Sequence, residues 1–254
     1  MRLLRRILIT AAITLGAIAL GVYWIAPAVL TFYTARRAPH VARVVPRELK
    51  DLSILQTPGT KLSYFGYEFE VPWTDLDETQ TKLSPKENPC KAVLTFRSGL
   101  RIAVTTIPPR EWAKNLAAEM KVSPERVESA FGQSDYDFLK TLYEFTPDKM
   151  RYWNAYHAFG REQFLLIVKS IALSKWADSG IFNIQNQGFK GFQEGSTNAG
   201  QDGLAVHLLS NEGSIEFIFL QKDYKQPGGL TQPEINRIVQ SLRKVPQNGP
   251  PSGN

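Results

Sequence analysis

Four residues in the middle of the chain have side chains that could bind a small ligand: Trp153, Tyr156, His157 and Arg161. They lie three or four positions apart, so they share one face if the segment is helical. Thr146-Pro147-Asp148, just before them, is typical of a helix start. Aromatic rings beside an imidazole and a guanidinium could hold a small acidic ligand or a partner's carboxylate. In the alternative interpretation, the aromatic rings pack on a sheet and the basic side chains form a solvent-exposed rim.

The remaining patterns do not predict catalysis. Ser241 and Lys244 match Ser-x-x-Lys, but the Ser-Asp-Asn and Lys-Thr-Gly motifs that accompany it in serine enzymes are absent. Asp75, Asp77 and Glu78 resemble oxygen ligands for calcium, but the glycine and the distal Glu of an EF-hand loop are missing. We interpret this run as a solvated acidic loop and predict no catalytic residue.

Metal and cofactor chemistry is not predicted either. His40, His157 and His207 are far apart in the sequence, and the single cysteine, Cys90, has no histidine beside it. Structural and catalytic metal sites need several such side chains converging at short spacings. We therefore expect no metal, no cofactor and no internal disulfide.

Alternating and hairpin patterns predict the strands of a sheet. Tyr67, Phe69 and Val71 alternate with glutamates, which predicts a first strand with one apolar face. Further strands are expected at residues 181–185 and in two hairpins, which join residues 92–96 to 100–107 and 204–209 to 215–220.

Helices are predicted between the hairpins and at the end of the domain. The expected starts are Trp112, Ser123, Ser134, Thr146 and a segment from Phe164 that stops at Ser179-Gly180. The last helix begins with a Thr231 to Glu234 capping box. Its apolar stripe comprises Ile235, Ile238, Val239 and Leu242, whereas Arg237 and Gln240 are expected on the exposed face.

This succession predicts an α+β protein. We expect one α/β/α-type sandwich domain with a mainly antiparallel sheet and a C-terminal amphipathic helix. The opening strand, which ends in Pro72-Trp73, and the closing segments 216–219 and 238–243 resemble PsbP-like domains, the fold of a photosystem II extrinsic protein. The resemblance is limited to the two ends of the domain, since the helical residues 110–178 depart from the family pattern. It implies an α/β sandwich and no functional residue.

A membrane anchor is predicted at the start of the chain, because residues 7–35 carry no charged side chain. About 20 apolar residues cross a hydrocarbon core about 30 Å thick, and residues 7–26 suffice. A signal peptide cut near Ala26-Pro27-Ala28 is the alternative. Small residues at positions 12, 16, 17 and 21 are compatible with association of this helix with another copy or with another membrane protein.

The predicted organisation of the chain follows from this anchor. Residues 1–6 would be cytoplasmic and residues 27–60 a juxtamembrane linker, with helical turns near residues 48–55. The globular domain would comprise residues 61–245, and residues 246–254 a disordered tail.

The distribution of charge excludes a nucleic-acid footprint on the folded part. The formal charge of the chain is +6, but residues 1–50 hold eight Lys or Arg against Glu48. The other residues therefore carry 22 positive and 23 negative side chains. The basic excess lies beside the predicted anchor, where anionic lipid attracts Lys and Arg, so the expected partner is the lipid bilayer.

Two classes of function remain open. The favoured hypothesis is a non-enzymatic binding or accessory module, held by a single-pass anchor in the cytoplasmic (inner) membrane with its domain extracytoplasmic. The alternative is a membrane-tethered hydrolase with a dispersed active site near His157.

Overall fold

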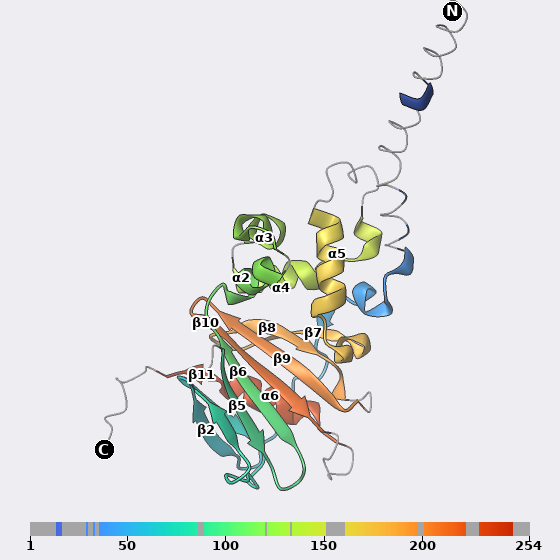
Figure 1. Cartoon of the computed structure of the whole chain (residues 1–254). Coiled ribbons are helices and arrows are strands. Elements are labelled where there is room, and N and C mark those ends of the chain that lie inside the picture. The colour runs from blue at the N-terminus through green and yellow to red at the C-terminus, as the bar shows by residue number, and fades with distance from the viewer. Residues whose placement is uncertain are drawn as a thin grey trace, which may run out of the picture. The chain divides into compact units, whose positions relative to one another are not determined.

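The computed structural model describes residues 14–16, 29, 33, 36–85, 89–119, 121–132, 134–150, 161–197, 201–221 and 229–245; at 130, 161, 163 and 164 it describes the backbone alone. The protein is α+β with a mixed, mostly antiparallel main sheet (Figure 1). It forms two compact units. Unit 1 comprises Met1–Arg43 and Phe145–Ala172, and unit 2 comprises Val44–Glu144 and Leu173–Asn254.

Unit 2 is built on two sheets. The described main sheet has eight strands in the order β1 (Pro46–Glu48), β7 (Ile181–Gln185), β8 (Lys190–Glu194), β9 (Gly203–Ser210), β10 (Gly213–Leu220), β6 (Arg101–Ile107), β5 (Cys90–Thr95) and β4 (Lys82–Ser84). Adjacent strands in this sheet are antiparallel, except that β1 and β7 are parallel. The smaller sheet has the order β11 (Arg243–Lys244), β3 (Tyr67–Val71) and β2 (Thr60–Tyr64). Both predicted hairpins are confirmed.

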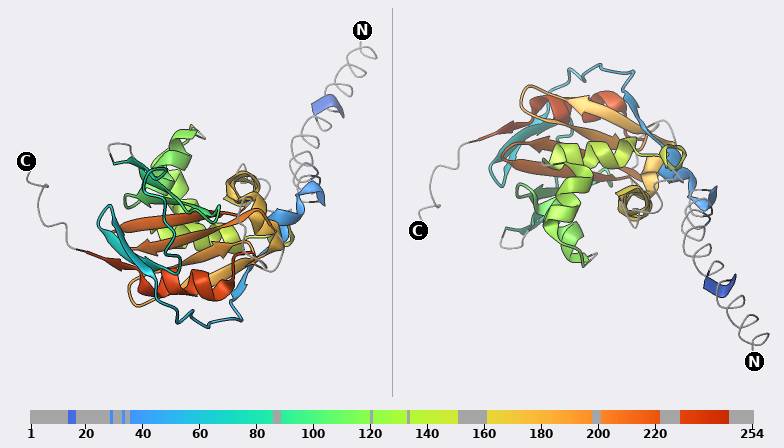
Figure 2. Two further views of the ribbon diagram at one scale, coloured as in Figure 1. Left: turned by 90° about the horizontal axis from the view of Figure 1, so that it is seen from below. Right: turned by 90° about the horizontal axis from the view of Figure 1, so that it is seen from above.

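One face of the main sheet packs against the smaller sheet and helix α6 (Gln232–Ser241), as Figure 2 shows. The predicted capping box is present, with the Thr231 amide donating to Glu234 Oε2 at 2.7 Å. The predicted apolar stripe is confirmed, since all four of its residues are buried in the same core as Phe69 and Phe217. Those two rings meet edge to face at 5.0 Å, which joins the two sheets.

The other face of the main sheet is covered by helices α2 (Glu111–Glu119) and α4 (Asp135–Glu144), and helix α3 (Pro124–Phe131) packs against these two helices (Figures 1 and 2). Ser123 caps α3 as predicted, and its hydroxyl accepts from the Arg126 amide. Aromatic side chains of α4 pack on the sheet, where the Tyr143 ring lies edge-on to Phe192 with 4.8 Å between ring centroids. The 3-10 helix η4 (Lys175–Ser179) also belongs to unit 2.

Unit 1 contains the 3-10 helices η1 (His40–Arg43) and η2 (Pro147–Lys149) and helix α5 (Arg161–Ala172). Arg43 and Asp148 form an ion pair at 3.1 Å within it. None of the helices in the described ranges is long and apolar enough to cross a membrane. The predicted span, residues 7–26, lies almost wholly outside those ranges, as does the predicted tail at 246–254.

Three local predictions are wrong. Residues 49–59 are not helical; they run along α6, where the Asn236 amide donates to the carbonyls of Asp51 and Ser53. The helix expected to stop at Ser179-Gly180 ends at Ala172 and gives way to η4. Arg237 is not on an exposed face, because its guanidinium donates to the Leu55 carbonyl and to Glu70 Oε1, both at 2.8 Å.

Residues 46–48 also differ from expectation, since this part of the predicted linker forms β1 of the main sheet. The strands β2 and β4 were not predicted.

Candidate functional site

The ligand site expected from the sequence lies almost wholly outside the described residues. Trp153, Tyr156 and His157 belong to residues 151–160, which the structure does not describe. Arg161 begins α5, and only its backbone is described. The shared face of these residues therefore stays a prediction.

The structure instead brings ionisable side chains together on the helix-covered face of the main sheet. Phe192, His207 and Glu216 are directly paired across β8, β9 and β10, so their side chains point to the same face. Glu194 lies two residues beyond Phe192 and shares that face. The indole of Trp112, from α2, lies edge-on to the imidazole with 6.0 Å between ring centroids.

His207 stands between two carboxylates. Its Nδ1 is 3.3 Å from Glu216 Oε1, and its Nε2 is 3.6 Å from Glu194 Oε1. Nδ1 has no hydrogen bond of good geometry, so the contact with Glu216 is mainly an attraction between charges. His207 and Glu194 are both buried.

Glu194 is held as a carboxylate by three groups from different elements. The Tyr143 hydroxyl donates to Oε1, the Ser174 amide donates to Oε2 at 2.9 Å, and His207 faces Oε1. Burial works to raise the pKa of Glu194, but His207, Ser174 and Tyr143 outweigh it and lower the pKa to about 2. We call Tyr143, Glu194, His207 and Glu216 the buried ionic network.

The same network determines the charge of His207. Burial alone would lower the pKa of the imidazole, but the hydrogen-bonding and charge of Glu194 and the charge of Glu216 raise it above its ordinary value. Burial, and then the charge of Glu194, raise the pKa of the Tyr143 hydroxyl well above its usual range. A cation therefore lies between two anions, and the phenol remains neutral.

This arrangement suits stabilisation of the fold better than catalysis. A general base must reach a substrate proton, either directly or through one water molecule. Here His207, Glu194 and Tyr143 are buried and turned toward one another, under α2 and α4. The network joins α4 to three strands and leaves its central groups without access to a substrate.

A second buried ionisable group lies in unit 1. Lys169 of α5 is fully buried, and its Nζ donates to the Phe145 carbonyl at 2.7 Å. Burial, assisted by the charge of Lys149, lowers the pKa of Lys169 to about 8. An amine with this pKa could act as a nucleophile where a substrate reaches it. Its full burial argues against that role.

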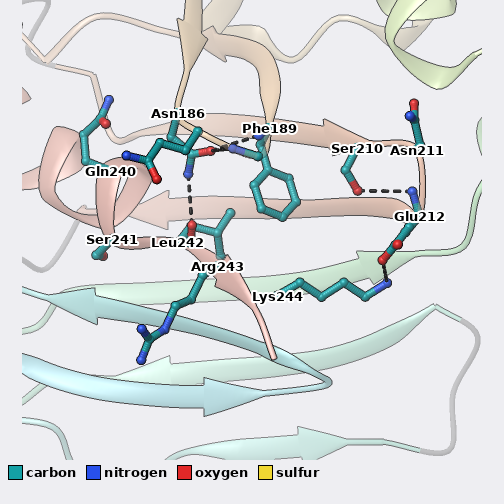
Figure 3. A pocket seen from close by; sticks show the side chains of 12 residues that line it. Asn186, Phe189, Ser210, Asn211, Glu212, Gln240, Ser241, Leu242, Arg243 and Lys244 are labelled. Atoms are coloured by element: carbon teal, nitrogen blue, oxygen red, sulfur yellow. Dashed lines mark hydrogen bonds and ion pairs between the residues drawn. The ribbon is translucent and has the colours of Figure 1, made fainter. Parts of the chain in front are cut away.

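An open groove of about 700 Å³ lies at the C-terminal end of α6 (Figure 3). Its walls are the β7–β8 turn (186–189), the β9–β10 turn (210–212) and residues 240–244. Most of the side chains at its rim are amides, hydroxyls or paired charges. Lys244 and Glu212, for example, form an ion pair at 2.6 Å across it.

Asn186 fixes the shape of this groove. Its Oδ1 accepts from the amides of Gly188 and Phe189, both at 2.9 Å, which closes the β7–β8 turn. Its Nδ2 donates to the carbonyl of Leu242 (Figure 3) and to that of Val239, which satisfies carbonyls at the end of α6. One side chain therefore ties two walls of the groove together before any ligand arrives.

Ser241 and Lys244, the residues of the Ser-x-x-Lys pattern, both line this groove, and each has a structural partner. Ser241 Oγ accepts from the Glu70 amide at 2.8 Å and donates to the Ile238 carbonyl, while Lys244 binds Glu212. The serine joins α6 to β3 and is not activated by the lysine.

The carboxylates of the acidic loop accept hydrogen bonds from the loop itself and from the β5–β6 turn. Asp77 Oδ1 accepts from the amide of Thr79 at 3.0 Å, and Asp75 Oδ2 accepts from the Ser98 amide at 2.7 Å. Within the described ranges, His, Cys, Asp and Glu side chains do not form a group of three that could hold a metal ion.

The buried ionic network was not predicted from the sequence, although the composition of the strands contains one indication of it. His207 and Glu216 are each the single ionisable residue of a strand that is otherwise rich in apolar residues, whereas Glu194 ends a strand that also contains Lys190 and Gln193. An ionisable residue on a buried strand face needs partners. Their spacing along the chain gives no indication that they meet.

Comparison with family models, curated proteins and solved structures gives no match to this chain. Its class is therefore defined by its own architecture, an α+β protein with a mostly antiparallel sheet, an internal ionic network and an open polar groove.

Proposed function

We propose that this protein is a non-enzymatic binding or accessory module that is anchored in the cytoplasmic membrane and holds unit 2 on the extracytoplasmic side. The groove at the end of α6 carries this proposal. It is open to solvent, its walls are fixed by Asn186, and it offers hydrogen-bonding groups without an activated nucleophile. The ionisable groups with the most perturbed pKa values in unit 2 are buried elsewhere.

The chemistry of the groove favours a neutral, hydrogen-bonding ligand such as an extended peptide segment of a partner protein. Asn211 and Gln187 at the turns offer amide groups, which match the donors and acceptors of a peptide backbone. Lys244 and Arg243 are each paired with a glutamate, so the lining offers little net attraction for an anion.

Anchoring and topology are supported by the sequence. The uncharged run at residues 7–35 is long enough to span a bilayer, and a short N-terminal segment before a large domain is usual for a signal-anchor. Layers on both faces of the main sheet support assigning unit 2 to the α/β/α-type sandwiches, and the PsbP-like resemblance remains a proposal of the same kind. The hydrolase alternative, centred on His157, gains no support from the described residues.

Site-specific photo-crosslinking tests the binding groove. A benzoyl-phenylalanine is placed at Asn211 in the full-length protein in its native membrane, and the matched control places it at Leu83, which is exposed on β4. We expect a discrete adduct from Asn211 and none from Leu83. Equal adducts from both sites, or none from either, would contradict the proposal that this groove binds a partner protein.

The anchor is tested independently. Carbonate washing should leave the protein in the membrane pellet, and protease added outside spheroplasts should degrade unit 2. Release by carbonate, or a mature N-terminus near Val29, would favour the signal-peptide alternative. Complete protection from protease would reverse the orientation.

A further inference from the structure

Helix α5 of unit 1 exposes apolar side chains where a solvent-facing helix would carry polar ones. Ile167 is 42% exposed and Ile171 is 69% exposed, and their spacing of four places them on one face. Leu165, Leu166 and Val168 of the same helix are buried. Helix α5 therefore has two apolar faces, one buried inside the protein and one exposed.

A groove of about 450 Å³ continues this face to residues 33–39. It is lined by Leu166, Ile167, Ser170 and Ile171 of α5 and by Tyr33, Arg37, Ala38 and Pro39. The guanidinium of Arg37 lies over the ring of Tyr33, 4.7 Å from its centroid. Both segments belong to unit 1.

We propose that Tyr33, Arg37, Ile167 and Ile171 form a surface that lies in the headgroup layer of the bilayer, with the isoleucines at the acyl boundary. This inference rests on the proposed membrane anchor. Three features identify lipid as the occupant. The groove begins seven residues after the predicted span ends at residue 26. Its lining combines apolar side chains with Tyr, an interfacial residue. The adjacent Arg36 and Arg37 add positive charge, which matches the anionic headgroups of a bilayer.

The predicted consequence is a second membrane contact formed by a helix that is distant in sequence from the anchor. Residues 161–172 would then restrict the motion of unit 1 on the bilayer, and the anchor would not act as a free tether. Lipid in the groove would also cover the apolar face of α5, which otherwise remains in contact with water.

Spin-label accessibility measures this contact. Full-length protein carrying Cys90→Ser and one new cysteine, Ile167→Cys or Ile171→Cys, is labelled and reconstituted into vesicles of phosphatidylcholine and phosphatidylglycerol. Leu83→Cys, on exposed β4 of unit 2, is the matched control. Accessibility to oxygen, which concentrates in lipid, is compared with accessibility to a water-soluble nickel chelate.

We expect the logarithm of the oxygen-to-nickel ratio to be positive at 167 and 171 and negative at 83. A negative value at 167 and 171 would place the surface in water and overturn the proposal. Low accessibility to both reagents would mean that a second copy or another protein covers it, which would also overturn it. Retention of the labelled protein in the vesicles after a carbonate wash tests the membrane anchor separately. A wrong prediction of the lipid contact can therefore be distinguished from a wrong prediction of the anchor.

Discussion

His207 on β9 and Glu216 on β10 are directly opposite residues whose side chains meet in a largely buried layer, with 3.3 Å between Nδ1 and Oε1. The second imidazole nitrogen faces Glu194 across 3.6 Å. The proton that makes His207 a cation therefore stabilises two carboxylates on two strands. Loss of that proton leaves the two carboxylates close together without a cation between them.

The stability of unit 2 should depend on pH through these groups. The folded-state pKa of His207 is raised, so its contribution is complete below about 6.5 and is lost as the pH rises through the folded pKa. The folded-state pKa of Glu194 is about 2, so its contribution is complete above about 4.5 and is lost as the pH falls toward 2. We expect chemical denaturation of the full-length protein in detergent to show a maximum between these limits. The decline on the alkaline side should be smaller in His207→Gln, and an equal decline in both proteins would contradict this assignment.

Removing the charge of His207 should strongly destabilise the fold. His207→Gln leaves Glu194 and Glu216 without their cation, and breaking a buried ion pair in this way costs about 3–5 kcal/mol. Adding Glu216→Gln should recover part of the loss, because it removes one of the two uncompensated carboxylates. Glu78→Gln, on the exposed acidic loop, is the control and should stay within about 0.5 kcal/mol. Equal effects of His207→Gln and Glu78→Gln in denaturant titrations would contradict the ionic network.

Arg237→Ala should destabilise the protein by about 1.5–3 kcal/mol, since hydrogen bonds of a charged group contribute on this scale. The guanidinium joins α6 to β3 through Glu70 and to the preceding segment through the carbonyls of Leu55 and Thr57. Arg237→Lys should restore only part of the stability, because an ammonium cannot span these acceptors as the planar guanidinium does. Gln240→Ala, on the exposed side of the same helix, is the matched control. Denaturant midpoints that coincide for Arg237→Ala and Gln240→Ala would show that these bonds contribute nothing.

Val239→Asp should unfold unit 2 or leave it barely stable. Val239 is buried between α6 and the sheets, and an uncompensated carboxylate there costs several kcal/mol out of a total stability of about 5–15 kcal/mol. Gln240→Asp introduces the same charge one residue later on the exposed side and should be tolerated. Circular dichroism during thermal unfolding measures both. A cooperative transition of Val239→Asp at the parent temperature would mean that α6 does not pack on the sheet.

Cys90→Ser should change neither stability nor oligomeric state. Cys90 is half-buried on β5, and its thiol donates to the Pro85 carbonyl at 3.2 Å, a contact that a serine hydroxyl can also make. We expect the same migration on non-reducing gels and a free energy of unfolding within about 0.5 kcal/mol of the parent. A loss of more than about 2 kcal/mol would show that the thiol packs in a role that the structure does not indicate.

The parts of the fold that the sequence predicts correctly are those specified by neighbouring residues. The capping box and stripe of α6 and both hairpins depend on spacings of two to four residues or on a turn between paired strands. β1 and β4 escaped prediction because each has three residues, too few to show a period. Arg237 was predicted to be exposed to solvent because periodicity identifies the apolar face of a helix. It does not indicate which segments pack against the other sides of that helix.

The candidate sites were much less predictable. Tyr143, Glu194 and His207 meet only because α4, β8 and β9 are brought together by the whole fold. The groove at the end of α6 likewise combines two turns with residues 240–244. By contrast, the predicted cluster at Trp153, Tyr156, His157 and Arg161 depends on local spacing alone, and its side chains lie outside the described part of the chain.

The main sheet ends in a three-residue strand on each side, β1 next to β7 and β4 next to β5. A long, flat outer strand offers a continuous row of unpaired backbone groups, on which a second molecule can add its own strand. Such short outer strands offer few of these groups, and both carry a lysine or an arginine, at Lys82 and Arg47. Molecules anchored in one membrane meet far more often than molecules diluted in solution. With the proposed anchor, copies of this protein would be such neighbours, and their short outer strands would help them to collide without aggregating edge to edge.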